Sequence, residues 1–387
     1  MSYKRSYAIF MRDDFYTRIF GDKKTERKKD GNFSVGDKKQ GDDFQKNNEF
    51  DMSKEDARSA KAAFSRIGIS LSAFSLISYA VVFITYLAIE LFFGNISEKI
   101  TENVWFVWGM NVVSMYLIAF PVMYLIVRGM KTVRRPKSKL YFDELIHLFL
   151  ISEAVMMVGN LVGVSLNSFI SAFIGKEITN GVAELITDSP IWVIILVAVV
   201  IGPIVEELIF RKLIIDRLSV FGDLTSVIVS AVLFGLFHGN LYQFFYAAGL
   251  GVVLGYVYTK TRNVIYPTVI HMLINFMGSV VALPISDMLV EFEKMTEVTA
   301  AGGEIDIQRY TLISLVIFAY TALEYGFAIA GMIILTKKLR AHDLYISSTA
   351  ETSIPKNKIA SVSILNLGMI LFLTVSLAQI AINIFTA

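Results

Sequence analysis

Long apolar stretches that recur after about residue 66 constrain the fold of this chain most strongly. An α-helix rises about 1.5 Å per residue, so about 20 apolar residues are enough to cross the hydrocarbon core of a bilayer. Several stretches reach this length. An isolated stretch within lipid can satisfy its backbone hydrogen bonds only as a helix. The sequence therefore predicts an all-α fold, a polytopic transmembrane helical bundle.

Composition agrees with a membrane protein and excludes several functions. The chain has 387 residues, of which 55% are hydrophobic and 18% are charged, and its mean hydropathy is +0.57. A formal net charge of +2 is too small to indicate a nucleic-acid partner. Cysteine is absent, which excludes disulfides, cysteine nucleophiles and thiolate metal sites. Any metal would need His, Asp or Glu ligands.

We expect about eight to nine spanning segments. Their ranges are 67–93, 104–127, 145–173, 190–215, 224–238, 241–259, 264–283, 310–336 and 361–385. The connection 128–139 is rich in Lys and Arg, so the positive-inside rule places it in the cytoplasm. The connection 284–308 is mainly acidic and belongs on the opposite face. This alternation predicts a cytoplasmic N-terminus and an outer C-terminus, and the Lys-rich, Cys-free composition suggests a bacterial cell membrane.

Residues 1–66 form a polar tail with 16 Lys or Arg against 12 Asp or Glu. The tail lacks the apolar core of a signal peptide, so we expect it to stay in the cytoplasm. Its composition between about Gly21 and Asp56 predicts partial disorder. An alternative is a short helix on the membrane surface, formed by the aromatic residues Tyr7, Phe10, Phe15, Tyr16 and Phe20. We divide the chain into this tail and a bundle over 67–387.

Three charged residues, Glu206, Glu207 and Arg211, lie inside the apolar run 191–215. One charged side chain at the centre of a membrane helix costs roughly 2.5–3.5 kcal/mol, so this cluster is a candidate site. Glu207 and Arg211 are four residues apart and share a helix face, where an ion pair offsets much of that cost. Glu206 is rotated by about 100° and keeps a free carboxylate suited to proton transfer. The alternative is that both glutamates only hold Arg211 and stabilise the bundle.

Two further pairs lie in later apolar segments. Phe234 and His238 are four residues apart, as are His271 and Asn275, so each pair shares one helix face. A lone histidine in such a helix is more often a hydrogen-bond partner between helices than a catalyst. Two histidines, a glutamate pair, an arginine and an asparagine within three segments are harder to explain by packing alone.

These groups supply what peptide-bond hydrolysis needs without a nucleophilic side chain. Glu206 with His238 would hold and deprotonate a water molecule, and His271 with Asn275 would donate to the oxyanion. We expect Phe234 to contact the substrate. The sequence thus predicts an intramembrane endopeptidase whose substrate is a membrane-associated peptide or protein.

The motifs Glu-Glu-x-x-x-Arg, Phe-x-x-x-His and His-x-x-x-Asn, in this order on successive segments, resemble those of the CAAX protease and bacteriocin-processing family. The resemblance covers about 190–283, which we take as the catalytic core. It implies a bundle whose conical cavity opens toward the cytoplasmic side, a water activated by glutamate, and cleavage near the cytoplasmic face. By position, the resemblance gives these roles: Glu206 as base, His238 as its partner, Glu207 and Arg211 as supporting pair, and His271 and Asn275 as oxyanion donors.

Three alternatives stay open. Glu206, His238 and His271 could hold zinc, although the H-E-x-x-H pattern is absent and the main expectation is no cofactor. A transporter or channel would use the charged cluster as a pathway, with Glu153 and Glu324 as further pathway groups. A non-catalytic scaffold or immunity protein would bind a peptide or a partner kinase without cutting it.

Overall fold

The computed structural model describes residues 52–133, 135–179, 181–346 and 354–386. In this part of the chain every regular element is helical. Eight of these helices are long and apolar enough to cross a membrane. The predicted all-α transmembrane bundle is therefore confirmed. The expectations of disorder and of a surface helix fall almost entirely on residues 1–51, which lie outside the described residues.

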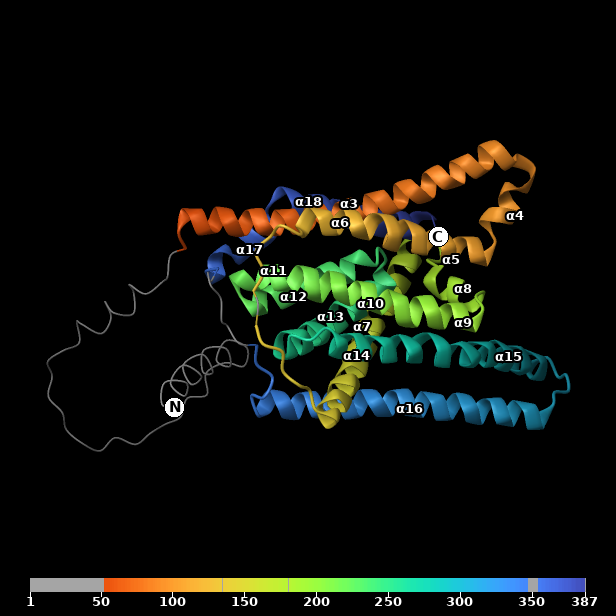
Figure 1. Cartoon of the computed structure of the whole chain (residues 1–387). Coiled ribbons are helices and arrows are strands. Elements are labelled where there is room, and N and C mark those ends of the chain that lie inside the picture. The colour runs from red at the N-terminus through yellow and green to blue at the C-terminus, as the bar shows by residue number, and fades with distance from the viewer. Residues whose placement is uncertain (1–51, 134, 180, 347–353, 387) are drawn as a thin grey trace, which may run out of the picture. The chain divides into compact units, whose positions relative to one another are not determined.

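Figure 1 shows the helices, with 3-10 and π segments named η. Their bounds are α3 Lys54–Phe93, η1 Gly94–Ile96, α4 Ser97–Thr101, α5 Val104–Asn111, η2 Val112–Ala119, α6 Phe120–Val127, α7 Phe142–Ile174, α8 Gly181–Thr187, α9 Ile191–Val193, η3 Ile194–Ile201, α10 Gly202–Glu207, η4 Leu208–Ile215, α11 Asp216–Leu218, η5 Ser219–Phe221, α12 Asp223–Phe237, α13 Leu241–Thr261, α14 Ile265–Asn275, η6 Phe276–Val281, α15 Ala282–Ala300, α16 Ile307–Arg340, η7 Lys356–Lys358, α17 Ile359–Ser363 and α18 Leu367–Thr386. Consecutive segments such as α5, η2 and α6 continue as one helix, so the spans are longer than the single elements.

The expected segment 224–238 is a short helix rather than a full span. α12 has 15 residues, or about 22 Å, against about 30 Å for the hydrocarbon core. α13 packs along α12 and returns the chain to the place where α12 begins. There, Arg262 Nη2 directly after α13 lies 2.7 Å from Oδ1 of Asp223, the first residue of α12. The direction of the chain therefore still reverses after α12, although α12 is shorter than a full span.

Helix α3 begins well before the predicted residue 67. Ser53 Oγ accepts a hydrogen bond from Asp56 N at 3.0 Å and caps the helix. Ala60 and Phe64 are fully buried in the first turns. The end of the polar tail thus belongs to the packed bundle, although its charges hide this from a count of apolar residues.

Glycines allow the closest helix crossings. A Cβ on Gly368 of α18 would lie 1.8 Å from Ser65 O of α3, and a Cβ on Gly331 of α16 would lie 1.8 Å from Leu150 O of α7. Small residues permit such backbone approach between membrane helices. Figure 1 shows α3 and α18 along one side of the bundle and α16 along the opposite side. These outer helices enclose the segment that carries the predicted site.

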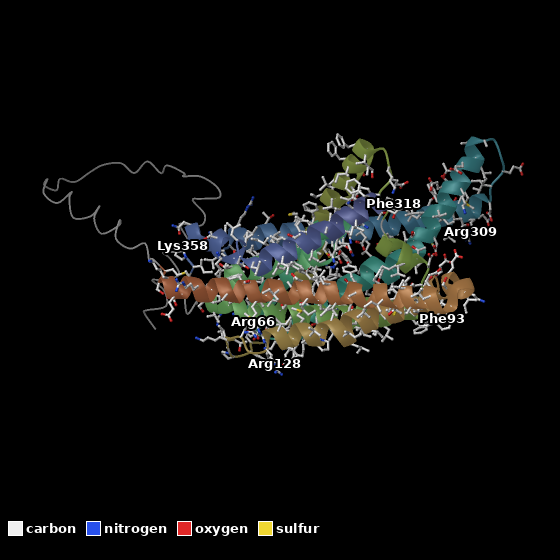
Figure 2. All side chains as sticks on the ribbon, turned by 90° about the horizontal axis from the view of Figure 1, so that it is seen from above. Arg66, Phe93, Arg128, Arg309, Phe318 and Lys358 are labelled. Atoms are coloured by element: carbon white, nitrogen blue, oxygen red, sulfur yellow. The ribbon has the colours of Figure 1, made fainter. Side chains whose placement is uncertain are left out.

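Basic residues gather at one end of the bundle. Figure 2 shows Arg66, Arg128 and Lys358 toward one end and Phe93 and Arg309 toward the other. This separation agrees with the predicted alternation of the connections. The side of the membrane that each end faces stays a prediction.

A buried ion-pair network closes the basic end. Asp223, 1% exposed, pairs with both Arg135 and Arg262. The Tyr258 hydroxyl donates to Asp216 Oδ1 at 2.7 Å, and Asp216 Oδ1 also lies 3.9 Å from an Arg262 nitrogen. The network joins the connection before α7 to the ends of α11, α12 and α13.

Candidate active site

Irregular helix turns border the two glutamates and Asn275. Glu206 and Glu207 end α10, which has π segments on both sides, η3 and η4. A third π segment, η6, begins directly after Asn275. Such segments are rare in proteins and are frequent at functional sites. The predicted site therefore lies where the helices depart from regular geometry.

Glu207 joins two partners from different helices. Its carboxylate is fully buried, with Oε2 at 3.0 Å from Arg211 Nε and Oε1 at 3.0 Å from His271 Nδ1. The pairing of Glu207 with Arg211 confirms the prediction from spacing, whereas the contact with His271 was not predicted. A carboxylate only accepts hydrogen bonds, so His271 carries a hydrogen on Nδ1. Glu207 thereby fixes the orientation of this imidazole.

Arg211 is a fully buried cation. Its guanidinium lies 4.8 Å from the centre of the Phe234 ring, a cation–π contact. Within the described residues Nη1 and Nη2 make no hydrogen bond, and the ion pair with Glu207 lacks hydrogen-bond geometry. One carboxylate and one aromatic face therefore compensate for the burial of this charge.

Phe234 separates the two histidines. Its ring centre lies 4.9 Å from that of His238 and 5.7 Å from that of His271, both edge-on. The side chain is only 1% exposed. Phe234 therefore packs among the predicted catalytic groups, and the structure gives it no open surface for the expected contact with substrate.

His238 lies at the turn between α12 and α13. Its Nδ1 is 2.8 Å from Phe234 O, and because a carbonyl only accepts, Nδ1 carries the hydrogen. In the neutral ring Nε2 then has a lone pair. Gly239 has a φ of +66°, the left-handed conformation that glycine tolerates. Asn240 caps α13 by accepting from Gln243 N at 2.8 Å and donates to His238 O at 3.1 Å. Local sequence thus fixes the turn that presents this histidine.

Glu206 is the accessible member of the glutamate pair. Its side chain is 20% exposed, and Oε2 lies 3.7 Å from His271 Nε2, beyond a direct hydrogen bond. The Tyr116 hydroxyl lies near it, because this oxygen and Glu206 Oε1 are 3.5 Å and 4.0 Å from a Cβ placed on Gly202. Sequence reasoning missed Tyr116 because a tyrosine in an apolar segment carries no motif. Glu206 therefore has polar neighbours but no Lys or Arg ion pair among the described residues.

Asn275 and His271 share α14 but have different partners. Asn275 Nδ2 donates to Ala198 O at 2.9 Å, while His271 binds Glu207. Their predicted joint action on an oxyanion is not tested by these contacts. An amide NH₂ group has two hydrogens, so one donor of Asn275 remains for another acceptor.

Comparison with known proteins identifies the central segment. Residues 188–277 match the family described as type II CAAX prenyl endopeptidase Rce1-like. This segment is similar to an Rce1-like domain. It contains all seven predicted site residues, whereas α3, α7, α16 and α18 lie outside it.

Two relatives match about the same share of the chain. YdiL of Bacillus subtilis (strain 168), named as a membrane peptidase, is 30% identical over 103 residues, and the membrane-embedded CAAX protease MroQ of Staphylococcus aureus (strain USA300) is 28% identical over 109 residues. Each match covers 26% of this chain and 42% or 44% of the relative. The chain thus spans less than half the length of these relatives. No solved structure matches the chain.

The Rce1-like segment does not present a ready metal site. Among the described residues, no group of three or more His, Asp or Glu side chains is arranged to hold a metal ion. Zinc held by Glu206, His238 and His271 stays an untested alternative.

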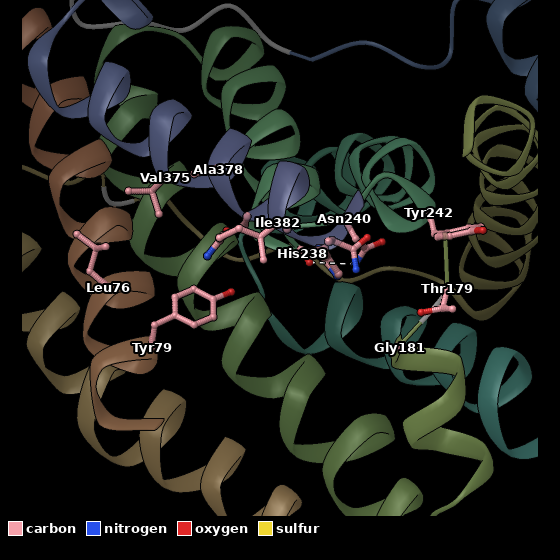
Figure 3. Close-up of a pocket in the computed structure, with 13 residues that line it drawn as sticks. Leu76, Tyr79, Thr179, Gly181, His238, Asn240, Tyr242, Val375, Ala378 and Ile382 are labelled. Carbon is pink, nitrogen blue, oxygen red and sulfur yellow. Dashed lines mark hydrogen bonds between the residues drawn. The ribbon is translucent and has the colours of Figure 1, made fainter. Parts of the chain in front are cut away.

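A cavity of about 540 Å³ lies beside His238 (Figure 3). Thr179 and Gly181, which follow the end of α7, help to line it. Asp223 of the buried ion-pair network begins α12, and the 15 residues of this helix lead to His238. The cavity therefore lies away from these ion pairs. The opening toward the cytoplasmic side that the resemblance implies stays a prediction.

Glu153 and Glu324 form a separate pair outside the Rce1-like segment. They lie on α7 and α16, which pack together, and the charge of Glu324 acts on Glu153. One carboxylate oxygen of each is buried without a hydrogen-bond partner among the described residues. Neither lines the cavity beside His238.

Proposed function

We propose that this protein is an intramembrane endopeptidase that hydrolyses a peptide bond with a water molecule activated by Glu206. One observation carries the proposal: of two adjacent glutamates, Glu207 is fully paired while Glu206 is partly exposed beside His271. The match of the surrounding segment to a family of CAAX endopeptidases supports the same chemistry.

In the proposed reaction, Glu206 takes a proton from a water molecule whose oxygen bonds to the scissile carbonyl carbon. The tetrahedral oxyanion then collapses, the C–N bond breaks, and Glu206 returns the proton to the leaving amine. One water is consumed, and one carboxyl group and one amine are formed. We assign to His238, whose Nε2 has a lone pair, the task of orienting the water.

The oxyanion requires hydrogen-bond donors at the opposite side of the carbonyl. Asn275 has one hydrogen left after its bond to Ala198 O. His271 holds a hydrogen on Nδ1 for Glu207, so its Nε2 donates only when the ring is protonated. We therefore propose that His271 acts as an imidazolium donor together with Asn275.

The proposed substrate is a membrane-associated peptide or protein, and bacteriocin-type peptides are one class that the family suggests. Glu206 lies 15 residues from each end of the helix Ile191–Phe221, so the bond that is cut lies within the membrane. We propose that substrate enters through the cavity beside His238, because this cavity borders a proposed catalytic residue. Cleavage near the cytoplasmic face stays part of this proposal.

The test is cleavage of a library of soluble and membrane peptides by purified protein, with product analysis by mass spectrometry. Glu206→Gln keeps the shape of the side chain but removes the base, and Glu153→Gln is a matched control outside the site. We expect cuts with wild type and Glu153→Gln and none with Glu206→Gln.

Other outcomes point to other functions. Equal cleavage by Glu206→Gln would refute the assigned base. No cleavage by any folded variant would favour the scaffold, and ion flux lost in Glu153→Gln without cleavage would favour the transporter. Activity that is lost with a chelator and restored by zinc would support the metal alternative.

A further inference from the structure

The cavity beside His238 has walls from two very different parts of the chain. One wall is the turn from His238 to Asn240 inside the Rce1-like segment. The facing wall comes from α3 and α18, near the two ends of the described chain and outside that segment. Figure 3 shows Leu76 and Tyr79 from α3 with Val375 and Ala378 from α18 around this space. The cavity is thus a feature of this chain's own outer helices.

The facing wall contacts the catalytic turn through Gln379. A Cβ added to Gly239 would lie only 3.2 Å from Gln379 Oε1. Tyr79 of α3 and Gln379 of α18 both line the cavity. Gln379 therefore packs against the residue that directly follows His238. A ligand bound in the cavity can therefore affect the position of the proposed catalytic residue His238 through the contact between Gln379 and Gly239.

The side chains that line the cavity favour binding of an uncharged ligand. No Lys, Arg, Asp or Glu is among the described residues that line the cavity. Aliphatic side chains form much of the wall, while Gln379, Asn383 and Asn240 supply carboxamides. Carboxamides can bind the N–H and C=O groups of a peptide backbone, whereas a charge buried here would have no partner. A volume of about 540 Å³ lies in the range of small-ligand sites, about 300–1,000 Å³.

We propose that this cavity binds a short, uncharged, apolar segment of the peptide substrate, and that α3 and α18 thereby set its specificity. The assignment of the occupant as substrate rests on the proposed function. Gln379 is a positioning residue that binds the peptide backbone beside His238. Peptides with Lys, Arg, Asp or Glu in this segment are excluded because the cavity cannot compensate their charge.

The test measures peptide binding in the Glu206→Gln background, so it does not depend on cleavage. Ala378→Trp fills the cavity, and Leu377→Trp adds the same ring to the neighbouring residue, which is 59% exposed and lies outside the lining. Fluorescent peptides with a central Leu-Val-Leu or Lys-Val-Lys are compared in lipid nanodiscs. We expect Ala378→Trp to weaken binding of the apolar peptide at least tenfold and Leu377→Trp to leave it unchanged.

A second variant, which is nearly isosteric, keeps the test informative if Ala378→Trp does not fold. Gln379→Glu adds a charge without volume, and we expect it to weaken binding of the Leu peptide and strengthen that of the Lys peptide. Equal affinities for both peptides in all folded variants would overturn the proposal. The proposal would also be overturned if Ala378→Trp lost a bound lipid while its affinity for the peptide stayed unchanged. Binding as expected without any cleavage by the wild type would instead refute the proposed function and leave a peptide-binding site.

Discussion

At the level of single residues, two adjacent glutamates have opposite environments. Glu207 is fully buried and joins Arg211 to His271. Glu206 is 20% exposed and lies close to His271 Nε2. One carboxylate therefore stabilises the site while the other is accessible for chemistry, and substitutions should separate these two roles.

Removal of Arg211 should destabilise the fold more than loss of the Glu206 charge. Arg211→Ala leaves Glu207 buried with its charge only partly compensated, and breaking a buried pair costs about 3–5 kcal/mol. Glu206→Gln should change the unfolding free energy less, because this side chain is 20% exposed and its contact with His271 Nε2, at 3.7 Å, is longer than a direct hydrogen bond. Thermal unfolding in detergent measures the loss of stability in both variants. A larger loss in Glu206→Gln than in Arg211→Ala would contradict the assigned roles.

Replacement of Glu207 should affect turnover through His271. In Glu207→Gln the amide NH₂ group can donate to Nδ1, which moves the imidazole hydrogen to Nε2. Nε2 then still donates, but without the positive charge of the proposed imidazolium, and loss of one oxyanion donor lowers kcat roughly 10²–10³-fold, so we expect a loss of up to about 10³-fold here. KM should change little. Steady-state kinetics with the exposed Glu293→Gln as control checks this, and an unchanged kcat would count against the role of Glu207.

At the level of elements, the outer helices pack through glycines where no side chain fits. α16 crosses α7 at Gly331, where a Cβ would overlap the backbone of Leu150. Gly326, on the same helix, has nothing within 4 Å of a Cβ. The same substitution at these two positions should therefore have opposite effects.

Gly326→Ala should stabilise the protein by up to about 1 kcal/mol, the difference in helix propensity between the two residues. Gly331→Ala should destabilise it by about 1–3 kcal/mol, because overpacking at a backbone contact forces the helices apart. Melting temperatures of the two variants in one detergent provide the comparison. A similar shift in both would mean that the crossing at Gly331 is not tight.

At the scale of the whole molecule, buried ion pairs hold together segments that are distant in sequence. Asp223 pairs with Arg135 from the connection before α7 and with Arg262 from the end of α13. This network closes one end of the bundle, and the cavity beside His238 lies toward the other. The chain is therefore asymmetric along the direction in which its helices run.

Loss of Asp223 should open the closed end. Asp223→Ala leaves Arg262, only 7% exposed, without its closest carboxylate, which should cost about 3–5 kcal/mol. Limited proteolysis should then cut the connection 128–139 faster than in the wild type. Asp287→Ala, at an exposed position, is the control. Unchanged proteolysis and melting would show that the network does not hold this end.

Much of the fold followed from sequence because its causes are local. The length of an apolar run determines whether a helix can cross the membrane, and the charges of the connections determine the alternation. Four-residue spacing predicted that Glu207 meets Arg211 and that Phe234 meets His238, and the structure confirms both contacts. The roles of these residues in catalysis stay predictions.

Only the tertiary structure decided which helices meet and which faces they share. No sequence pattern predicted that Glu207 contacts His271, that Asn275 binds Ala198, or that α3 and α18 face His238 across a cavity. The physical reason is that these membrane helices are apolar on all sides, so periodicity marks no inner face. Their rotation is determined instead by glycine crossings and by a few buried polar contacts between residues far apart in the chain.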